Sequence, residues 1–230
     1  MKPQNLEILR RDALPLGGFA GLKEHRLVTG KKLWGDRANL EAWDGIGNFV
    51  YLADAQFDPN GETGMHSHKE IDVISVMVKG RIAHQGSLEH GGSLNTFDVQ
   101  VQSAGGEGFS HNEVNPDDTK NRMLQLWVMP EVSGQPARYE KSTVTWGNTT
   151  RIYGGTREGG LAFPAQTTID IAMLRAGESI ELTDPYLAYV AAGDGQAGDT
   201  RVTDGDLIRG TGASFTAKTD AQLIVVGTLA

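Results

Sequence analysis

The sequence of 230 residues contains no cysteine, which excludes disulfide bonds, zinc–thiolate sites and thiol catalysis. It also lacks any uninterrupted apolar run long enough to span a membrane. The first residues, Met1–Glu7, include no apolar core of the kind that signal peptides have. We therefore expect a cytoplasmic protein that is not embedded in a membrane.

Basic residues are fewer than acidic residues: the sequence has 21 Lys and Arg and 29 Asp and Glu, which gives a net charge of −8. Proteins that bind nucleic acid neutralise its phosphates with clustered Lys and Arg. Direct binding to nucleic acid is therefore not expected. The acidic excess is interpreted as a contribution to solubility.

No long amphipathic helix pattern occurs anywhere in the chain. The ordered-looking stretches are short, such as the apolar run 73–78 and the stretch 97–102, which alternates with period two. Turn signals such as Asp58-Pro59-Asn60-Gly61 separate them, and the 30 glycines suit many tight turns. The pattern predicts an all-β protein.

The second half of the chain repeats the first half in outline. The run Leu187–Gly193 resembles the run that ends at Gly80, and later strand-like runs also have counterparts. A break rich in proline and glycine lies at 130–136. A weak repeat of roughly a hundred residues indicates a duplicated β-barrel. We place the two domains at 1–132 and 133–230.

Six histidines are present, and all of them lie before residue 112: His25, His66, His68, His84, His90 and His111. His66 and His68 would project from one face of a strand, and so would His111 and Glu113, because alternate strand residues share a face. If the two strands are neighbours, the four side chains converge. Three imidazoles and a carboxylate suit a divalent first-row metal. An isolated His-x-His pair would more often be a polar strand face.

These motifs resemble the two signature motifs of the cupin superfamily and, more closely, the pirin family. The matching stretches are His66-x-His68, Gly80-x-x-x-His84, Asp98-Val99-Gln100, Ala104-Gly105, His111-x-Glu113 and Leu124-Gln125-Leu126-Trp127-Val128-x-Pro130. The likeness covers residues 45–141 well and the rest in outline. It implies an all-β bicupin with two stacked cupin barrels, of which the N-terminal barrel holds metal and the C-terminal barrel lacks metal ligands.

The resemblance implies metal ligands at His66, His68, His111 and Glu113. It favours iron, with nickel, copper, manganese, cobalt or zinc as alternatives. Asp72 stays open as a ligand, because general cupins carry a further carboxylate at this place and Asp72 shares strand parity with the His pair. We favour Glu113 as the ligand and Asp72 as an acceptor that orients an imidazole N–H.

The other histidines and the tryptophans are given plainer roles. His25, His84 and His90 are interpreted as structural or exposed. The tryptophans are expected in the core or in a pocket wall. They are Trp34, Trp43, Trp127 and Trp146.

The resemblance implies two classes of function. One is a dioxygenase of the quercetin 2,3-dioxygenase type, which cleaves a flavonol-like aromatic substrate with O2 and uses Glu113 as both ligand and proton acceptor. The other is a metal- or redox-sensing regulatory protein that acts through a protein partner without turnover. A small-molecule isomerase is a third reading, because fold does not fix function. An apolar pocket beside the metal would favour an enzyme, and a closed metal site with an outer apolar patch would favour a regulator.

Overall fold

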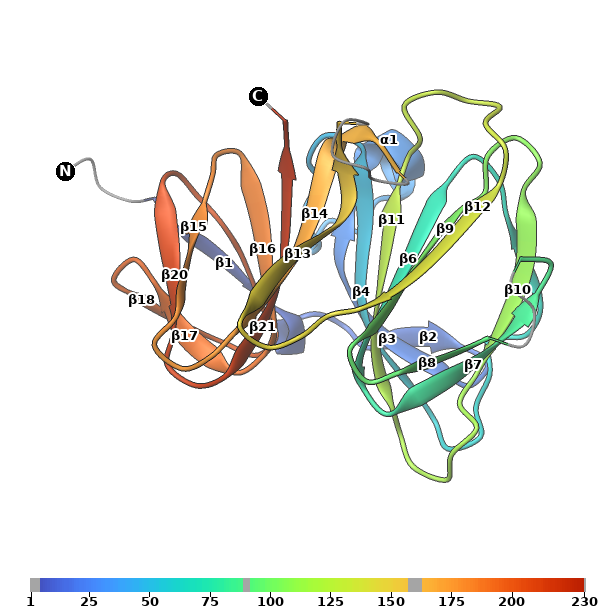
Figure 1. Ribbon diagram of the computed structural model, residues 1–230, viewed down its shortest axis with the longest axis horizontal. Coiled ribbons are helices and arrows are strands. Elements are labelled where there is room, and N and C mark those ends of the chain that lie inside the picture. Colours follow the sequence, from blue (N-terminus) through green and yellow to red (C-terminus); the bar gives the residue numbers. More distant parts are fainter. Residues whose placement is uncertain (1–4, 89–91, 157–162, 230) are drawn as a thin grey trace. The chain divides into compact units, whose positions relative to one another are not determined.

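The computed structural model describes residues 5–88, 92–156 and 163–229 (Figure 1). Strands dominate these residues, so the expected all-β class is confirmed. The helical segments among the described residues are η1 (Arg11–Ala13), α1 (Lys31–Trp34) and η2 (Gly35–Arg37). No helix in the described part of the chain is long and apolar enough to cross a membrane.

The chain separates into two compact units, each made of a larger and a smaller antiparallel sheet. The first unit, Leu14–Thr143, is called the N-terminal barrel below. The chain from Val144 on, with the N-terminal segment that ends at Ala13, forms the second unit, called the C-terminal barrel. The two-barrel architecture expected of a bicupin is therefore confirmed.

The N-terminal barrel is built from a seven-stranded sheet and a four-stranded sheet. The order in the large sheet is β12 (Arg138–Thr143), β9 (Asp98–Ser103), β6 (Asp72–Lys79), β11 (Arg122–Val128), β4 (Phe49–Phe57), β3 (Leu22–Thr29) and β2 (Gly17–Phe19). The order in the small sheet is β5 (His66–His68), β10 (Phe109–Val114), β7 (Arg81–Gly86) and β8 (Ser93–Asn95). Figure 1 shows β10 and β7 across the barrel from β4 and β11.

Side chains from both sheets of the N-terminal barrel meet in its interior. Ile82 and Leu94 of the small sheet pack with Phe57, Met77 and Met123 of the large sheet in one buried cluster. Burial of this apolar surface is the main driving force that holds the two sheets together. The cluster occupies one region of the interior, and the polar side chains described below occupy another.

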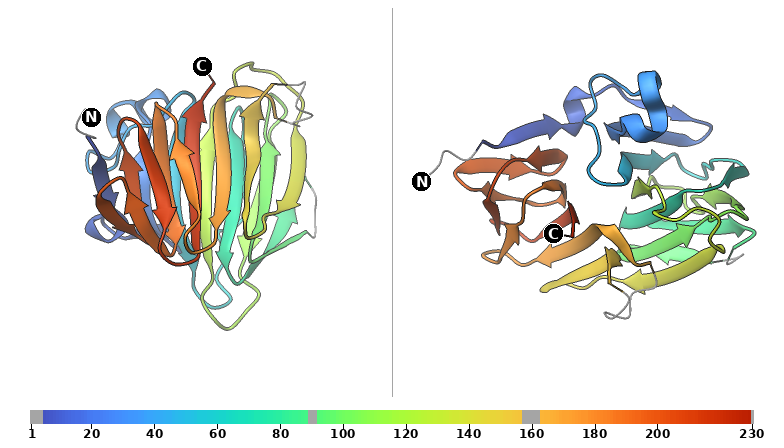
Figure 2. Two further views of the ribbon diagram at one scale, coloured as in Figure 1. Left: turned by 60° about the vertical axis from the view of Figure 1, so that its left-hand side comes forward. Right: turned by 90° about the horizontal axis from the view of Figure 1, so that it is seen from above.

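The C-terminal barrel has the same two-sheet construction. Its large sheet runs β1 (Glu7–Arg10), β19 (Asp206–Arg209), β16 (Tyr186–Ala192), β21 (Ala221–Thr228), β14 (Ala165–Leu174) and β13 (Asn148–Gly155). Its small sheet runs β15 (Ser179–Leu182), β20 (Ala213–Ala217), β17 (Asp194–Ala197) and β18 (Thr200–Thr203). Figure 2 shows the strands of each sheet running side by side.

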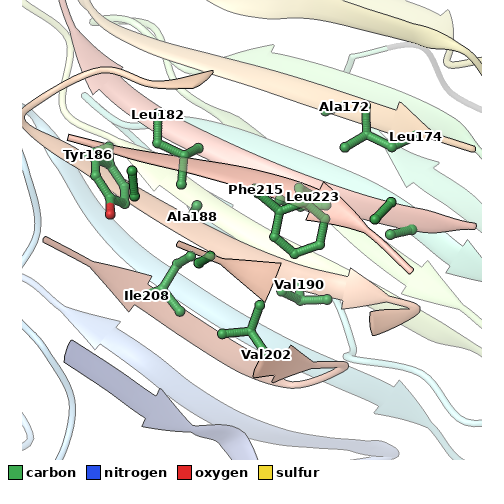
Figure 3. Packing of buried hydrophobic residues seen from close by; sticks show 14 residues of the cluster. Ala172, Leu174, Leu182, Tyr186, Ala188, Val190, Val202, Ile208, Phe215 and Leu223 are labelled. Atoms are coloured by element: carbon green, nitrogen blue, oxygen red, sulfur yellow. The ribbon is translucent and has the colours of Figure 1, made fainter. Parts of the chain in front are cut away.

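A cluster of fourteen buried residues fills the interior of the C-terminal barrel. Phe215 lies against Leu223, with Val190 and Val202 close by (Figure 3). Since no histidine follows residue 111, the imidazole cluster of the first barrel has no counterpart in this one. That the C-terminal barrel lacks metal ligands stays a prediction.

The division of the chain differs from the predicted boundary between residues 132 and 133. β12 pairs with β9 up to Thr143, so the chain stays in the N-terminal barrel beyond the proline-rich break. At the other end, β1 pairs with β19, from Glu7 opposite Arg209 to Arg10 opposite Asp206. Composition cannot reveal that β12 belongs to the N-terminal barrel or that β1 belongs to the C-terminal barrel. Both assignments depend on backbone pairing between strands that are far apart in sequence.

Candidate metal centre

The two motifs that carry the candidate ligands lie on neighbouring antiparallel strands. In the pairing of β5 with β10, His111 is directly opposite His66, and Phe109 is opposite His68. Alternation along β5 puts His66 and His68 on the same face. The strand spacing therefore brings three imidazoles together, as the sequence pattern predicts.

The three rings present nitrogen atoms to one another. His111 Nε2 lies 2.9 Å from His66 Nε2 and 3.1 Å from His68 Nε2. All three side chains offer a ligand atom within 4.8 Å of the other two. A metal–imidazole bond is about 2.1 Å, so two nitrogens at right angles around one ion lie about 3 Å apart. The observed separations fit a single ion held by all three rings.

The tautomer of His66 suits metal binding. Its Nδ1 lies 2.9 Å from the carbonyl oxygen of Gly64, which can only accept, so Nδ1 carries the proton. The lone pair of a neutral imidazole is then on Nε2, the atom that faces the other rings. Hydrogen bonds of this kind commonly orient metal-bound histidines.

Burial keeps two of the three histidines neutral. Desolvation, helped by the nearby His66 ring, lowers the pKa of His68 to about 4. Desolvation and the neighbouring imidazoles also hold the pKa of His111 well below the usual value. Metal ions bind the neutral imidazole, and protons compete less for rings with depressed pKa values.

Glu113, the fourth predicted ligand, is buried two residues beyond His111 on β10. Its Oε1 accepts a hydrogen bond of 3.2 Å from Ser75 Oγ. Burial raises the pKa of Glu113 to about 7, although the Ser75 hydroxyl acts in the opposite direction. Among the described residues, the group with ligand atoms within 4.8 Å of one another consists of the three histidines without Glu113. Its role as a ligand stays a prediction.

The parity argument for Asp72 does not hold in the structure. β5 ends at His68, and Glu70 has a φ of 52°, which interrupts the extended backbone. Asp72 then begins β6, which belongs to the large sheet, whereas β5 belongs to the small sheet. Counting alternate residues from His68 to Asp72 therefore has no geometric meaning.

His84 was undervalued by the sequence interpretation. It is 2% exposed, and β7 places it opposite Glu113 in the pairing with β10. Its Nε2 lies 3.1 Å from Nδ1 of His111. The signal was the Gly80-x-x-x-His84 step of the family resemblance. His25, by contrast, has a structural contact, from Nδ1 to the carbonyl of Leu14, and His90 lies outside the described residues.

A cavity of about 430 Å³ opens beside the histidine cluster, within the N-terminal barrel. His66, His68 and Glu113 line it. Apolar and aromatic side chains make up much of the remaining wall. They are Phe19, Leu22, Leu33, Trp34, Tyr51, Ala55, Ile71 and Trp127. The cavity thus has an apolar wall with metal-binding groups at one place.

Three aromatic rings form a layered part of this wall. The Tyr51 and Trp127 ring centroids are 4.5 Å apart, and Trp34 is stacked on Trp127 at 6.1 Å with an interplanar angle of 11°. The Trp127 centroid is 5.5 Å from that of His68. The expectation that tryptophans line a pocket is confirmed for Trp34 and Trp127.

A fixed polar group lies in the same wall. Glu24 is buried and accepts hydrogen bonds from the Tyr51 hydroxyl, at 2.9 Å, and from Arg26 Nε, at 2.7 Å. Burial, together with the nearby Glu24 charge, raises the pKa of Tyr51. Tyr51 therefore stays protonated at neutral pH, and its hydroxyl is tied to Glu24.

Comparison with known proteins agrees with the motifs. Residues 37–128 match the family model described as Pirin. A putative quercetin 2,3-dioxygenase of Zymomonas mobilis is 37% identical over 81 residues, which are 35% of this chain and 34% of the relative. The quercetin 2,3-dioxygenase of Escherichia coli (strain K12) is 34% identical over 79 residues, 34% of each chain. These alignments span only about a third of the relatives' length.

Longer matches extend over both barrels. A pirin-like protein of Caulobacter vibrioides is 28% identical over 186 residues, 75% of this chain and 80% of the relative. The crystal structure of a bacterial pirin from Escherichia coli in complex with nickel(II) superposes with a TM-score of 0.81 at 17% identity, covering 96% of this chain and 97% of that chain. The resemblance to the pirin family is confirmed: residues 37–128 match its model, and the chain has a two-barrel cupin fold.

Proposed function

We propose that this protein is a metal-dependent dioxygenase of the quercetin 2,3-dioxygenase type, acting on a flavonol-like aromatic substrate with O2. His66, His68, His111 and Glu113 would hold one divalent ion, with iron in first place. The observation that carries the proposal is the convergence of three imidazole nitrogens beside an aromatic-lined cavity. Relatives named quercetin 2,3-dioxygenase and the nickel(II) complex of a pirin with this fold support it.

Each part of the cavity has a chemical task in this proposal. A divalent transition metal supplies Lewis acidity and, if redox-active, electron exchange with dioxygen. The faces of Trp34 and Trp127 stack against a flat substrate ring. The Glu113 carboxylate would accept the proton of a substrate hydroxyl.

The regulatory alternative receives less support from the cavity. A sensor without turnover would be expected to have a closed metal site. Here His66 and His68 line a cavity of about 430 Å³, within the range of small-molecule binding pockets. The cavity therefore favours an enzyme over a closed sensor.

The proposed activity is tested with the complete protein loaded separately with Fe, Mn, Co, Ni or Cu. With quercetin, at least one loaded form is expected to consume O2 while the visible absorbance of the flavonol disappears. The same protein without metal serves as the control. Absence of O2 uptake with every ion would contradict the proposal and favour the regulatory alternative.

The aromatic wall offers a test of substrate binding. Trp34→Leu is expected to raise KM for quercetin about two- to tenfold with little change in kcat, because ring stacking contributes about 0.5–1.5 kcal/mol. Trp146→Leu is the matched control, since Trp146 contacts Arg175 in the C-terminal barrel. Steady-state kinetics measure both variants. Equal effects would show that Trp34 does not contact the substrate.

A further inference from the structure

A buried chain of polar side chains connects Glu113 with His111 through the interior of the N-terminal barrel. Its members come from β6, β7, β9 and β10, and each is at most 2% exposed. They are Ser75, His84, Gln100, Gln102, His111 and Glu113. Polar groups are costly to bury unless they bond to one another, so their directions of donation and acceptance are constrained.

The first half of this series of hydrogen bonds starts at Gln100, whose amide nitrogen donates in two directions. It lies 3.4 Å from Ser75 Oγ and 3.1 Å from Gln102 Oε1. Ser75 Oγ in turn donates to Glu113 Oε1 at 3.2 Å. One amide group thus supports the Glu113 carboxylate through Ser75 and fixes the orientation of the Gln102 amide.

The second half runs from Gln102 to His111. Gln102 Nε2 lies 3.3 Å from His84 Nε2, and His84 Nε2 lies 3.1 Å from His111 Nδ1. An amide nitrogen only donates, so His84 Nε2 must present a lone pair. His111 Nδ1 must then carry the proton in its contact with His84. Since a neutral imidazole has one N–H, the lone pair of His111 is on Nε2.

This lone pair points at the place where the three rings converge, because His111 Nε2 is the atom nearest to both His66 Nε2 and His68 Nε2. If the hydrogen bond between these two histidines ran in the opposite direction, His84 Nε2–H would donate to His111 Nδ1. His111 would then be protonated on Nε2 and unable to bind a metal through that atom. The amide orientation of Gln102 selects between the two arrangements.

We propose that Gln102 and His84 are positioning residues that preset the metal-binding tautomer of His111. Gln100 holds the Gln102 amide in place by donating to its Oε1, and it is linked to Glu113 through Ser75. The inference rests on the proposed metal site, and it adds that metal affinity depends on two residues that contact no metal. Because the lone pair of His111 is already on Nε2, this ring does not have to change its tautomer when the ion binds.

The test is calorimetric titration with zinc, which is not redox-active, on the complete protein. His84→Phe removes the acceptor and is expected to weaken zinc binding about ten- to a hundredfold, the usual effect of losing such a partner. His84→Gln, whose side-chain oxygen accepts a hydrogen bond, is expected to recover part of the loss. His25→Phe is the matched control, because His25 contacts the Leu14 carbonyl outside the chain of hydrogen bonds.

Two substitutions of Gln102 test the direction. Gln102→Met removes the amide with little change in volume and is expected to weaken zinc binding only a few-fold, since His84 still accepts from His111. Gln102→Glu replaces the donor by an acceptor, favours a proton on His84 Nε2, and is expected to weaken zinc binding at least as much as His84→Phe. Thermal unfolding of each variant separates misfolding from a change in affinity.

Long-range ¹H–¹⁵N spectra of the metal-free protein report the tautomers directly. We expect the proton of His111 on Nδ1, and an unprotonated Nε2 in His84. A proton on His84 Nε2, or equal zinc affinities of His84→Phe and His25→Phe, would overturn the inference while leaving the metal site intact. Failure of the unchanged protein to bind zinc would overturn the proposed metal site and the inference with it.

Discussion

His111→Ala is expected to abolish stoichiometric metal binding, whereas the unchanged protein binds one ion per chain. His111 Nε2 is the atom that lies within about 3 Å of both other imidazole nitrogens, so its loss removes the centre of the cluster. The affinity should fall more than about a hundredfold, beyond the range seen when only an outer partner is lost. Elemental analysis and calorimetric titration measure the effect.

The controls for this experiment lie in the same barrel. His66→Ala should behave like His111→Ala, because the two residues are directly opposite on β5 and β10. His25→Ala should bind metal normally, since His25 Nδ1 contacts the Leu14 carbonyl and lies outside the cluster. Full metal content in both His66→Ala and His111→Ala would refute the site.

Glu113→Gln is expected to lose flavonol turnover even when excess metal restores occupancy. The amide can still coordinate weakly through its oxygen, but it cannot accept a proton from the substrate. Burial raises the pKa of the Glu113 carboxyl to about 7 in the metal-free protein, and a bound divalent ion would lower this pKa, which favours the proton-accepting carboxylate. Oxygen uptake at saturating metal measures turnover, and calorimetry measures metal affinity separately.

Asp72→Asn is the matched control, because it makes the same change from carboxyl to amide at another buried position of the barrel. It should lower metal affinity less than Glu113→Gln and retain turnover. The reverse order of affinities would assign the fourth ligand to Asp72. Normal turnover in Glu113→Gln would show that another group accepts the proton.

The alternation rule predicted the parts of the site that lie within single strands. It placed His66 with His68 on one face of a strand and His111 with Glu113 on one face of another. That these two strands are neighbours was a condition of the argument, and the pairing of β5 with β10 meets it. The rule failed where the backbone leaves the extended conformation, at Glu70, so the parity of Asp72 was wrong. The rule gave no information about the role of His84, because its contact with His111 depends on the register between β7 and β10.

Local sequence patterns also could not predict the cavity wall or the boundaries of the two units. Trp34 comes from α1 and Trp127 from β11, and only the folded barrel stacks them. The exchange of β1 into the C-terminal barrel pairs Glu7 with Arg209, and no feature of residues 7–10 alone indicates this partner. Tertiary register decides such contacts, whereas sequence periodicity reports only which face a residue occupies.

The pairing of β1 with β19 also sets an order of events during synthesis on the ribosome. The N-terminal barrel is one continuous segment, so it can fold as soon as Thr143 has emerged. Residues Glu7–Arg10 leave the ribosome before the N-terminal barrel, yet their partner strand β19 emerges only after that barrel. Until then β1 is an unpaired strand, and a chaperone that shields such edges would protect the nascent chain. Deleting this strand should leave the metal site intact but expose the β19 edge to aggregation.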